Sequence, residues 1–406
     1  MIGQVQEKAV QQETWVSNLA GSSKGHAIIS GFRMKLIHLK LKFTLLKIAM
    51  ACYHNPWNWI RSLRYLVVLR RRFLGNNIVK KMVYSGDKYY MGLYTPGWNS
   101  VVYKTFIATQ LNDFKAVDRG VVNRFNTVFI AITKKCALQC EHCYEWEQLN
   151  KKDILSNTVL HDIVKKIQDR GVSQIQFLGG EPLLSMDALV NVLVTAKKST
   201  DFWVATSGFK LNAANARRLK EAGLTGVIIS LDHYIPEKHN AFRHFEDAFY
   251  WVEEAVKHAN SNQLVTALSL CATKEFISEE NLMAYMTLAK TLQVSFVQIL
   301  EPKAVGHYAD KDVLLKQQHI DLLENFFLKM NFNANYYTFP LITYHGYYQR
   351  RQGCFSGGIK GIYVDTDGDM NACPFCHKKT GNVLGSGFDK NLELLKSEGC
   401  SGYKLN

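Results

Sequence analysis

Three cysteines lie close together near the middle of the chain, as Cys136, Cys140 and Cys143 in the segment CALQCEHC. Thiolates spaced by four and then three residues can converge on one centre, and these soft ligands select zinc or iron–sulfur clusters. Tetrahedral zinc would take a fourth ligand, for which His142 is available. Three thiolates on a four-iron cluster would leave one iron open to a small chelating molecule. The spacing predicts a metal centre and leaves both kinds open.

A second set of cysteines occupies the C-terminal part of the chain, as Cys354, Cys373, Cys376 and Cys400. Four thiolates are enough for one iron–sulfur cluster, and a Cys-x2-Cys pair also suits structural zinc. We predict that the neighbouring His377 is a surface residue. The two remaining cysteines, Cys52 and Cys271, lie in stretches with many apolar residues, where free cysteines are commonly inert packing residues.

The net charge of +14 comes from one segment of the chain. The stretch from Thr14 to Gly86 holds thirteen Lys and Arg and no Asp or Glu, whereas the rest of the chain has 36 basic and 35 acidic residues. A local excess of positive charge is typical of a surface that contacts an anionic partner. We therefore predict a basic patch within this segment and an electrostatically balanced body.

Two stretches of this basic segment, residues 35–53 and 56–74, are predicted to be helices. Asn55 is a suitable N-cap for the second helix, which has Pro56 at its first position. Neither stretch has the run of about 18 uncharged apolar residues that a membrane-spanning helix needs. Their composition suits helices lying on an anionic membrane through residues 24–81, and equally a helical hairpin packed on the rest of the chain. No nucleic-acid-binding pattern accompanies them, so we expect no nucleic acid partner.

The first residues of the chain are polar and lack the apolar core of a secretory signal peptide. We therefore expect a cytoplasmic location, with peripheral attachment at the inner face of the membrane if the basic helices bind lipid. In a reducing compartment, clustered thiols are more often metal ligands than disulfides.

The elements that would position these residues alternate between strand and helix from about residue 126 onward. Five predicted helices separate six predicted strands, which lie within residues 127–133, 172–182, 202–208, 225–233, 264–273 and 294–302. Such alternation indicates a parallel sheet with helices outside it, as an open doubly wound sheet or a partial barrel. In both folds the functional residues gather where the strands end. The first cysteine set follows the first strand, in agreement with this rule.

These motifs together resemble the radical S-adenosylmethionine (SAM) superfamily. The Cys-x3-Cys-x2-Cys loop resembles the signature that holds its [4Fe–4S] cluster, and Gly179-Gly180-Glu181-Pro182 resembles the motif that contacts the SAM amino group. The resemblance spans roughly residues 125–306. It implies an α/β fold with a partial (β/α)6 TIM-like barrel, and further contacts to SAM from Ser207, Ser230, Asp232 and Arg243. From the residues alone, the last two could equally form a surface ion pair.

The C-terminal cysteines resemble the SPASM/twitch extension of radical SAM maturases. The spacing from Cys354 through Gly368 to Cys373 matches this extension, but only Cys400 remains of its later cysteines. The resemblance implies a truncated domain with one auxiliary [4Fe–4S] cluster, and zinc on the same four thiolates is the alternative. We expect three units: a basic helical extension with a small β element at 1–120, the barrel at 121–310, and a small cysteine-rich domain at 311–406.

The activity implied by the resemblance is the generation of a 5′-deoxyadenosyl radical from SAM, which abstracts hydrogen from a C–H bond. The expected substrate is a peptide or protein, with an electron donor such as flavodoxin or ferredoxin as a second partner. One alternative is a membrane-associated radical SAM enzyme that modifies a lipid or isoprenoid, suggested by the basic helices. A second alternative is a zinc-binding protein without catalysis.

Overall fold

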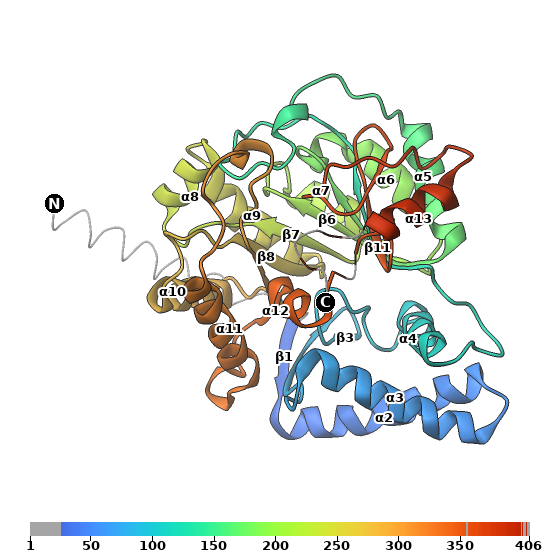
Figure 1. Ribbon diagram of the computed structural model, residues 1–406. Coiled ribbons are helices and arrows are strands. Elements are labelled where there is room, and N and C mark those ends of the chain that lie inside the picture. Colours follow the sequence, from blue (N-terminus) through green and yellow to red (C-terminus); the bar gives the residue numbers. More distant parts are fainter. Residues whose placement is uncertain (1–25, 355, 399, 401–402, 404–406) are drawn as a thin grey trace.

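The computed structural model describes residues 26–354, 356–398, 400 and 403. A nine-stranded sheet in the order β10-β9-β8-β7-β6-β5-β4-β11-β12 forms its centre (Figure 1). Every neighbouring pair is parallel except β11 and β12. The strands are β4 (Phe125–Ala131), β5 (Val172–Leu178), β6 (Asp201–Thr206), β7 (Gly226–Ser230), β8 (Val265–Cys271), β9 (Phe296–Leu300), β10 (Leu341–Tyr344), β11 (Gly361–Val364) and β12 (Met370–Asn371).

Helices connect the parallel strands and cover the outer face of the sheet (Figure 1). Their apolar sides and the outward residues of the strands form one large core, which includes Ile163 on α5, Leu219 on α7 and Val252 on α9. The helices are α5 (Asn157–Arg170), α6 (Met186–Thr195), α7 (Ala213–Ala222), α8 (Pro236–Arg243), α9 (Ala248–Ser261), α10 (Glu279–Thr291), α11 (Gln317–Phe332), α12 (His345–Gln352) and α13 (Phe388–Glu398).

Local sequence signals set several of these helix ends. The side chain of Ser156 accepts a hydrogen bond from Val159 N and caps α5, and Ser278 caps α10 in the same way. Gly171 ends α5 with a φ of 82°, a conformation that glycine adopts without steric cost. These capped helices alternate with β4 to β9, which confirms the predicted six-strand series and the partial-barrel fold.

Two parallel strands beyond the six extend the sheet at its edges. β10 pairs with β9, and β11 pairs with β4, where Ile362 lies opposite Val128. Both strands come from residues 311–406, so this part of the chain shares the sheet of the barrel. Among the described residues, no pairing joins β10 to β12, and the barrel is therefore not closed by hydrogen bonds. The pairing of β11 brings the C-terminal cysteines to the strand that carries the first set.

The N-terminal part forms a separate antiparallel sheet with three helices packed on it. β2 (Lys81–Ser85) lies between β1 (His26–Ser30) and β3 (Lys88–Tyr90). Gly86 and Asp87, both with positive φ, form the tight turn between β2 and β3. The helices are α2 (Gly31–Cys52), α3 (Pro56–Leu74) and α4 (Val101–Phe114).

The predicted basic helices are confirmed with small shifts at their ends. α2 begins four residues before the predicted start at Lys35, and Asn55 caps α3 by accepting a hydrogen bond from Trp57 N. No helix among the described residues has the length and apolar character required to cross a bilayer. Of the stretch 24–81, residues 24 and 25 lie outside the described residues.

The N-terminal sheet packs against the inside of the barrel, near the ends where the strands begin. Val83, Tyr90 and Leu93 form a cluster with Val265, the first residue of β8, and with corresponding residues of β9 and β10. Tyr94 reaches the interior, where its hydroxyl accepts a 3.0 Å hydrogen bond from Gln298 on β9. The candidate site lies at the opposite ends of the strands, which carry the cysteine loop.

Candidate functional site

The first cysteine loop is fixed by backbone hydrogen bonds at both ends. Cys136 N donates to the Asn150 side chain over 3.0 Å, and Glu181 N donates to Lys135 O over 2.7 Å. At the other end, His307 N donates to Cys143 O over 2.9 Å. Since these contacts come from three separate strand ends, the barrel itself holds the loop in place.

Two glycines allow neighbouring turns to approach this loop closely. A Cβ at Gly180 would collide with the carbonyl oxygen of Lys135 and lie 3.1 Å from the Cys136 Cβ. A Cβ at Gly306, which has a φ of 58°, would collide with the carbonyl oxygen of Cys143. The predicted Gly-Gly-Glu-Pro motif therefore has a steric reason for glycine at its second position. At Gly179, a φ of 146° and a 2.5 Å approach to Thr133 O require glycine as well.

The three thiols of this loop are half-buried or buried. Burial raises the pKa of Cys136 and of Cys143 to about 12, which keeps both thiols protonated at neutral pH in the apoprotein. Cys140 accepts a 3.3 Å hydrogen bond from Arg243 Nη1 through its sulfur atom. Burial raises the pKa of Cys140, and this guanidinium opposes the shift by favouring the thiolate, which is the form that binds metals.

The Glu181 carboxylate is fully buried and accepts four hydrogen bonds from the protein. Its Oε1 accepts from Leu183 N (3.1 Å) and from Thr206 Oγ1 (2.7 Å). Its Oε2 accepts from both the backbone N (2.8 Å) and the Oγ (2.5 Å) of Ser207. Burial raises the pKa of Glu181, and these bonds oppose that shift. The structure thus brings Glu181 and Ser207 together, and the carboxylate fixes the turn after β6.

Asp232 and Arg243 form a buried ion pair with an Nη2–Oδ2 distance of 2.5 Å. The alternative of a surface ion pair is therefore wrong: the two residues are only 4% and 6% exposed. Cys271 N also donates to Asp232 Oδ1 over 3.1 Å. Burial alone would raise the pKa of Asp232, but the Arg243 charge, together with His142, His239 and the hydrogen bond from Cys271 N, lowers it. The pair places a buried positive charge beside Cys140.

The remaining predicted contact, Ser230, is the last residue of β7 and pairs in register with Ser269 of β8. It shares the inward side of its strand with Ile228, whereas Ile229 faces the outer core. Ser230 and Asp232 therefore belong to the same strand end as the ion pair, while the Glu181 cluster lies at the ends of β5 and β6.

The C-terminal cysteines also come together. The side chains of Cys354 and Cys400 share a hydrogen bond, and the Cys373 thiol lies within electrostatic range of Cys354, Cys376 and Cys400. Cys373 and Cys376 face each other across a short antiparallel bridge. Burial raises the pKa of Cys373 to about 11. His377 is exposed, as predicted, and Cys52 and Cys271 are buried packing residues.

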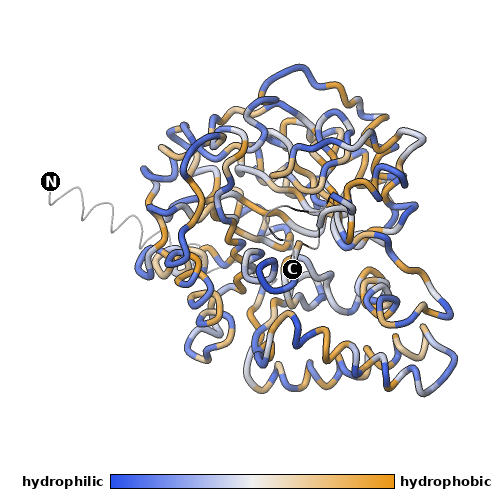
Figure 2. Tube along the Cα trace, viewed as in Figure 1, coloured by the Kyte–Doolittle hydropathy of each residue, from blue (hydrophilic) through white to orange (hydrophobic). Residues whose placement is uncertain are grey.

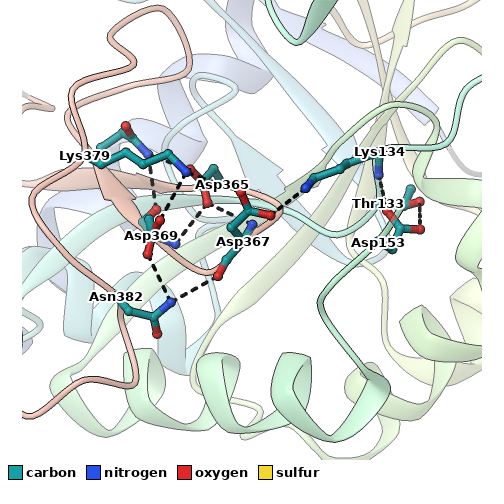
Figure 3. Close-up of polar contacts among 9 residues, drawn as sticks. Thr133, Lys134, Asp153, Asp365, Asp367, Asp369, Lys379 and Asn382 are labelled. Atoms are coloured by element: carbon teal, nitrogen blue, oxygen red, sulfur yellow. Dashed lines mark hydrogen bonds and ion pairs between the residues drawn. The ribbon is translucent and has the colours of Figure 1, made fainter. Parts of the chain in front are cut away.

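The two cysteine sets are in contact through an aromatic and a charged link. The Tyr144 ring, next to Cys143, lies 5.8 Å from the Phe375 ring, which stands between Cys373 and Cys376. Tyr144 also lies 6.3 Å from Tyr363 of β11, whose hydroxyl donates to Glu145. On the other side, Lys134 Nζ donates a 2.6 Å hydrogen bond to Asp367 (Figure 3).

An acidic turn between β11 and β12 was not anticipated from the sequence. The carboxylates of Asp365, Asp367 and Asp369 surround Lys379 Nζ at 2.9, 3.4 and 3.1 Å (Figure 3). The DTDGD sequence is a visible signal for an acidic turn, but the partner lysine lies ten residues further on. This turn fixes the segment that leads to Cys373 and Cys376.

Two histidines lie at the first loop: His142, which the sequence offered as a fourth zinc ligand, and His307, which was not anticipated. His142 packs on Phe242 at 5.1 Å, its buried Nδ1 has no hydrogen-bond partner among the described residues, and burial lowers its pKa to about 4. His307 stacks on Trp146 at 3.9 Å and hydrogen-bonds Cys140 O. Within the part of the chain that the structure describes, no three His, Cys, Asp or Glu side chains are arranged to hold a single metal ion.

Comparison with known families and curated proteins identifies relatives of the central region. Residues 130–285 match the family described as the radical SAM superfamily. The GTP 3′,8-cyclase of Aliarcobacter butzleri is 26% identical over 191 residues, which cover 45% of this chain and 58% of that protein. The GTP 3′,8-cyclase of Campylobacter jejuni strain RM1221 is 28% identical over 185 residues, with 44% and 57% coverage. The chain spans a little over half the length of these curated relatives.

Solved structures resemble a larger part of the chain. Streptococcus suis SuiB bound to the precursor peptide SuiA aligns with 85% of this chain and 80% of that chain, with a TM-score of 0.56 and 13% identity. The structure described as native anSMEcpe with bound AdoMet and Cp18Cys peptide aligns with 69% and 84%, with a TM-score of 0.51 and 20% identity. At these identities the likeness is one of fold.

Proposed function

Residues 130–285 form a radical SAM domain, and from this premise we propose that the chain is a radical SAM enzyme that modifies a peptide or protein. When bound, a [4Fe–4S] cluster and SAM supply a 5′-deoxyadenosyl radical by one-electron cleavage, and this radical abstracts hydrogen from a substrate C–H bond. The hard chemistry belongs to the cofactors, so the residues of the chain have to bind, orient and exclude water.

Cys136, Cys140 and Cys143 are the residues proposed to hold the cluster. The three thiols are not arranged for a single metal ion, but their number and type suit a larger cluster, and their loop has a backbone that is fixed from several strand ends. Arg243 at 3.3 Å from the Cys140 sulfur lowers the cost of placing thiolate charge there. Loss of the thiol protons is coupled to metal binding, as with other thiolate sites.

The proposed SAM contacts divide into two groups around the loop. Gly179 and Gly180 let the turn after β5 lie against Cys136, which supports the proposal that their backbone groups would contact SAM bound at the cluster. Glu181 acts mainly by positioning Ser207, since it accepts both hydrogen bonds of that residue. Ser230, Asp232 and Arg243 would contact the ribose and carboxylate from the end of β7.

The C-terminal cysteines Cys354, Cys373, Cys376 and Cys400 are proposed to hold one auxiliary [4Fe–4S] cluster. The hydrogen bond between Cys354 and Cys400 and the backbone bridge between Cys373 and Cys376 support this assignment. Zinc on the same ligands is the alternative. Iron and zinc contents after anaerobic purification separate the two, because a zinc site would leave this set without the iron and sulfide of a cluster.

The contact between the two cysteine sets is the observation that carries the proposal. Tyr144 and Phe375 join the loops directly, so a substrate bound over Cys136 would lie close to the second set. This arrangement suits an auxiliary centre that anchors the substrate or accepts its electron. The fold likeness to SuiB with its bound peptide extends over 85% of this chain, whereas the GTP 3′,8-cyclases of Aliarcobacter butzleri and Alkaliphilus oremlandii align with 45% and 62% of it. Both facts favour a peptide over a nucleotide.

Replacement of Cys140 by Ala tests the proposed chemistry. The reconstituted wild-type chain should convert SAM to 5′-deoxyadenosine in the presence of dithionite, or of flavodoxin or ferredoxin with its reductase. Cys140→Ala should abolish this conversion and lose the iron of one cluster while keeping that of the auxiliary centre. Cys52→Ala is the matched control, since this buried cysteine lies in α2. Cleavage that survives in Cys140→Ala would exclude the assignment.

The substrate class requires a separate test. Candidate peptides encoded near the gene and GTP should be added to the reconstituted chain in turn. We expect a peptide to raise 5′-deoxyadenosine formation and to lose hydrogen mass, and GTP to leave the background rate unchanged. Turnover of GTP to a cyclised product would instead assign this chain the activity named for its curated relatives.

A further inference from the structure

Helix α2 has apolar residues on two opposite faces. One face packs on the N-terminal sheet and α4 and contains Met34, Ile37, Ile48, Ala49 and Cys52. The other face is exposed, and it consists of Phe32 (72%), Leu36 (50%), Leu39 (54%), Phe43 (59%) and Met50 (42%). Their spacing of four, three, four and seven residues places them on one stripe of the helix. The inner stripe has its partner within the chain, and the outer stripe has none among the described residues.

Helix α3 extends this exposed apolar surface. It lies beside α2 at the edge of the molecule (Figure 1) and exposes Trp57 (73%), Ile60 (49%), Val67 (47%) and Val68 (48%). The two helices together hold nine of the nineteen large exposed apolar residues found in the described part of the chain. Single exposed apolar residues are ordinary, but a concentration on two adjacent helices marks an interaction site.

Basic side chains surround the apolar residues of both helices. Helices α2 and α3 carry ten Lys and Arg and no Asp or Glu, and polar and apolar residues alternate along them (Figure 2). The ion pairs among described residues include none of these ten side chains. Their charge is therefore uncompensated within the described structure, in contrast to the balanced remainder of the chain.

We propose that the exposed faces of α2 and α3, called the docking face below, bind an anionic phospholipid bilayer. The apolar residues would enter the boundary between headgroups and acyl chains, and the Lys and Arg side chains would contact lipid phosphates. A second copy of this chain fits poorly, because it would place two acid-free basic surfaces against each other.

The position of the docking face suits attachment of the chain to a membrane, and not the delivery of a lipid substrate to the cysteine loops. Helix α2 packs on the N-terminal sheet, and that sheet packs against the first residues of β8, β9 and β10. Cys136 follows the last residues of β4, at the opposite end of the parallel strands. Docking would therefore hold the chain at the membrane while its cysteine loops stay away from the bilayer surface. This inference does not depend on the substrate class.

Vesicle flotation of the full chain tests the docking face. Vesicles of phosphatidylcholine with phosphatidylglycerol should carry the chain to the top of the gradient, and phosphatidylcholine alone should not. The double substitution Leu39→Glu and Phe43→Glu should weaken binding by more than about tenfold, since it removes apolar contact and adds repulsion. Val194→Glu with Tyr250→Glu is the matched control, because those residues are 67% and 59% exposed on α6 and α9.

A charge series completes the test. Replacing Lys35, Lys40 and Lys42 by Gln should weaken binding to the anionic vesicles by at least about tenfold and flatten its salt dependence. Lys151, Lys198 and Arg217, all exposed, serve as the control set. Absence of wild-type flotation at low salt overturns the proposal. The proposal is also overturned if Leu39→Glu with Phe43→Glu leaves flotation unchanged. In that case the docking face would serve whichever contact the variant disrupts: a dimer, a complex with an acidic protein, or a contact with residues 1–25.

Discussion

Lys134 and Asp367 join the two cysteine sets through a 2.6 Å hydrogen bond between Nζ and Oδ1. Lys134 lies two residues before Cys136 and its side chain is only 5% exposed, whereas Asp367 lies in the acidic turn that leads to Cys373. A buried ammonium needs a partner, because its charge is costly to keep in a poorly solvated site. The pair therefore constrains how the C-terminal loop sits on the first loop (Figure 3).

We expect Asp367→Asn to lower the free energy of unfolding by about 1–2 kcal/mol, since it leaves Lys134 without its anionic partner. Asp187→Asn removes a 2.7 Å ion pair with Arg218 that is largely exposed, and should cost about 0.5 kcal/mol or less. Urea unfolding of both variants measures the difference. Equal effects from the two substitutions would show that the Lys134 contact is no stronger than a surface pair.

The glycine after β5 offers a test of the first loop alone. Gly180→Ala should displace Lys135 and Cys136, because the added methyl group collides with the Lys135 carbonyl oxygen. After reconstitution, iron in the first centre should fall to less than about half, with the auxiliary centre retained. Gly92→Ala is the control, since its Cβ would meet only the Thr95 side chain at 3.6 Å. Full iron content in Gly180→Ala would mean that the loop can move aside.

Arg243 is expected to be needed for stability as well as for activity. Arg243→Gln would leave Asp232 buried without a cation, at a cost of about 3 kcal/mol or more. The same change removes the donor to Cys140 and should abolish 5′-deoxyadenosine formation. Arg217 forms an exposed ion pair with Glu221, so Arg217→Gln should change neither the free energy of unfolding nor 5′-deoxyadenosine formation measurably. A stable and active Arg243→Gln enzyme would remove this residue from the site.

Lys81 on β2 gives a pH-dependent prediction for the contact between the N-terminal sheet and the barrel. Its Nζ lies 2.9–3.1 Å from four backbone carbonyls, those of residues 330, 336, 339 and 340. Burial lowers its pKa from 10.5 to about 7. Between these two pKa values the unfolded chain binds more protons than the folded chain. The free energy of unfolding of the wild type should therefore rise with pH across this window, by at most about 1.4 kcal/mol per pH unit.

Lys81→Met isolates this effect. The variant removes the Lys81 donor from the four carbonyls, of which that of residue 336 still accepts from Phe339 N, and should be less stable than the wild type by about 2 kcal/mol near pH 9. The difference should shrink as the pH falls toward 7. Lys80→Met, at the exposed neighbouring position, should follow the wild type throughout. A difference that is independent of pH would show that Lys81 has an ordinary pKa.

The strand and helix series was predictable because each element has a local signal. Alternating apolar residues, Ser caps and terminal glycines placed β4 to β9 and their helices correctly. Helix α8 was missed, since its eight residues, PEKHNAFR, are mostly polar and lie in a segment read only as a SAM contact. The pairing of β11 with β4 has no local signal, because it joins residues far apart in the chain.

The site shows the same division between local and distant information. Cysteine spacing and the Gly-Gly-Glu-Pro motif drew attention to residues that do lie together. The sequence could not show that Arg243 would contact Cys140, that Lys134 would pair with Asp367, or that four carbonyls would surround Lys81. Each of these contacts joins separate elements and depends on burial, which a single sequence does not reveal.

The position of β11 also sets an order for biosynthesis. β4 is the first strand of the large sheet to leave the ribosome, and β11 is made after all the other strands that run parallel to it. Until then, one side of β4 is an unpaired edge, available to the edges of other nascent chains. A chain that terminates before residue 361 would keep that edge permanently exposed, and aggregation is its expected fate.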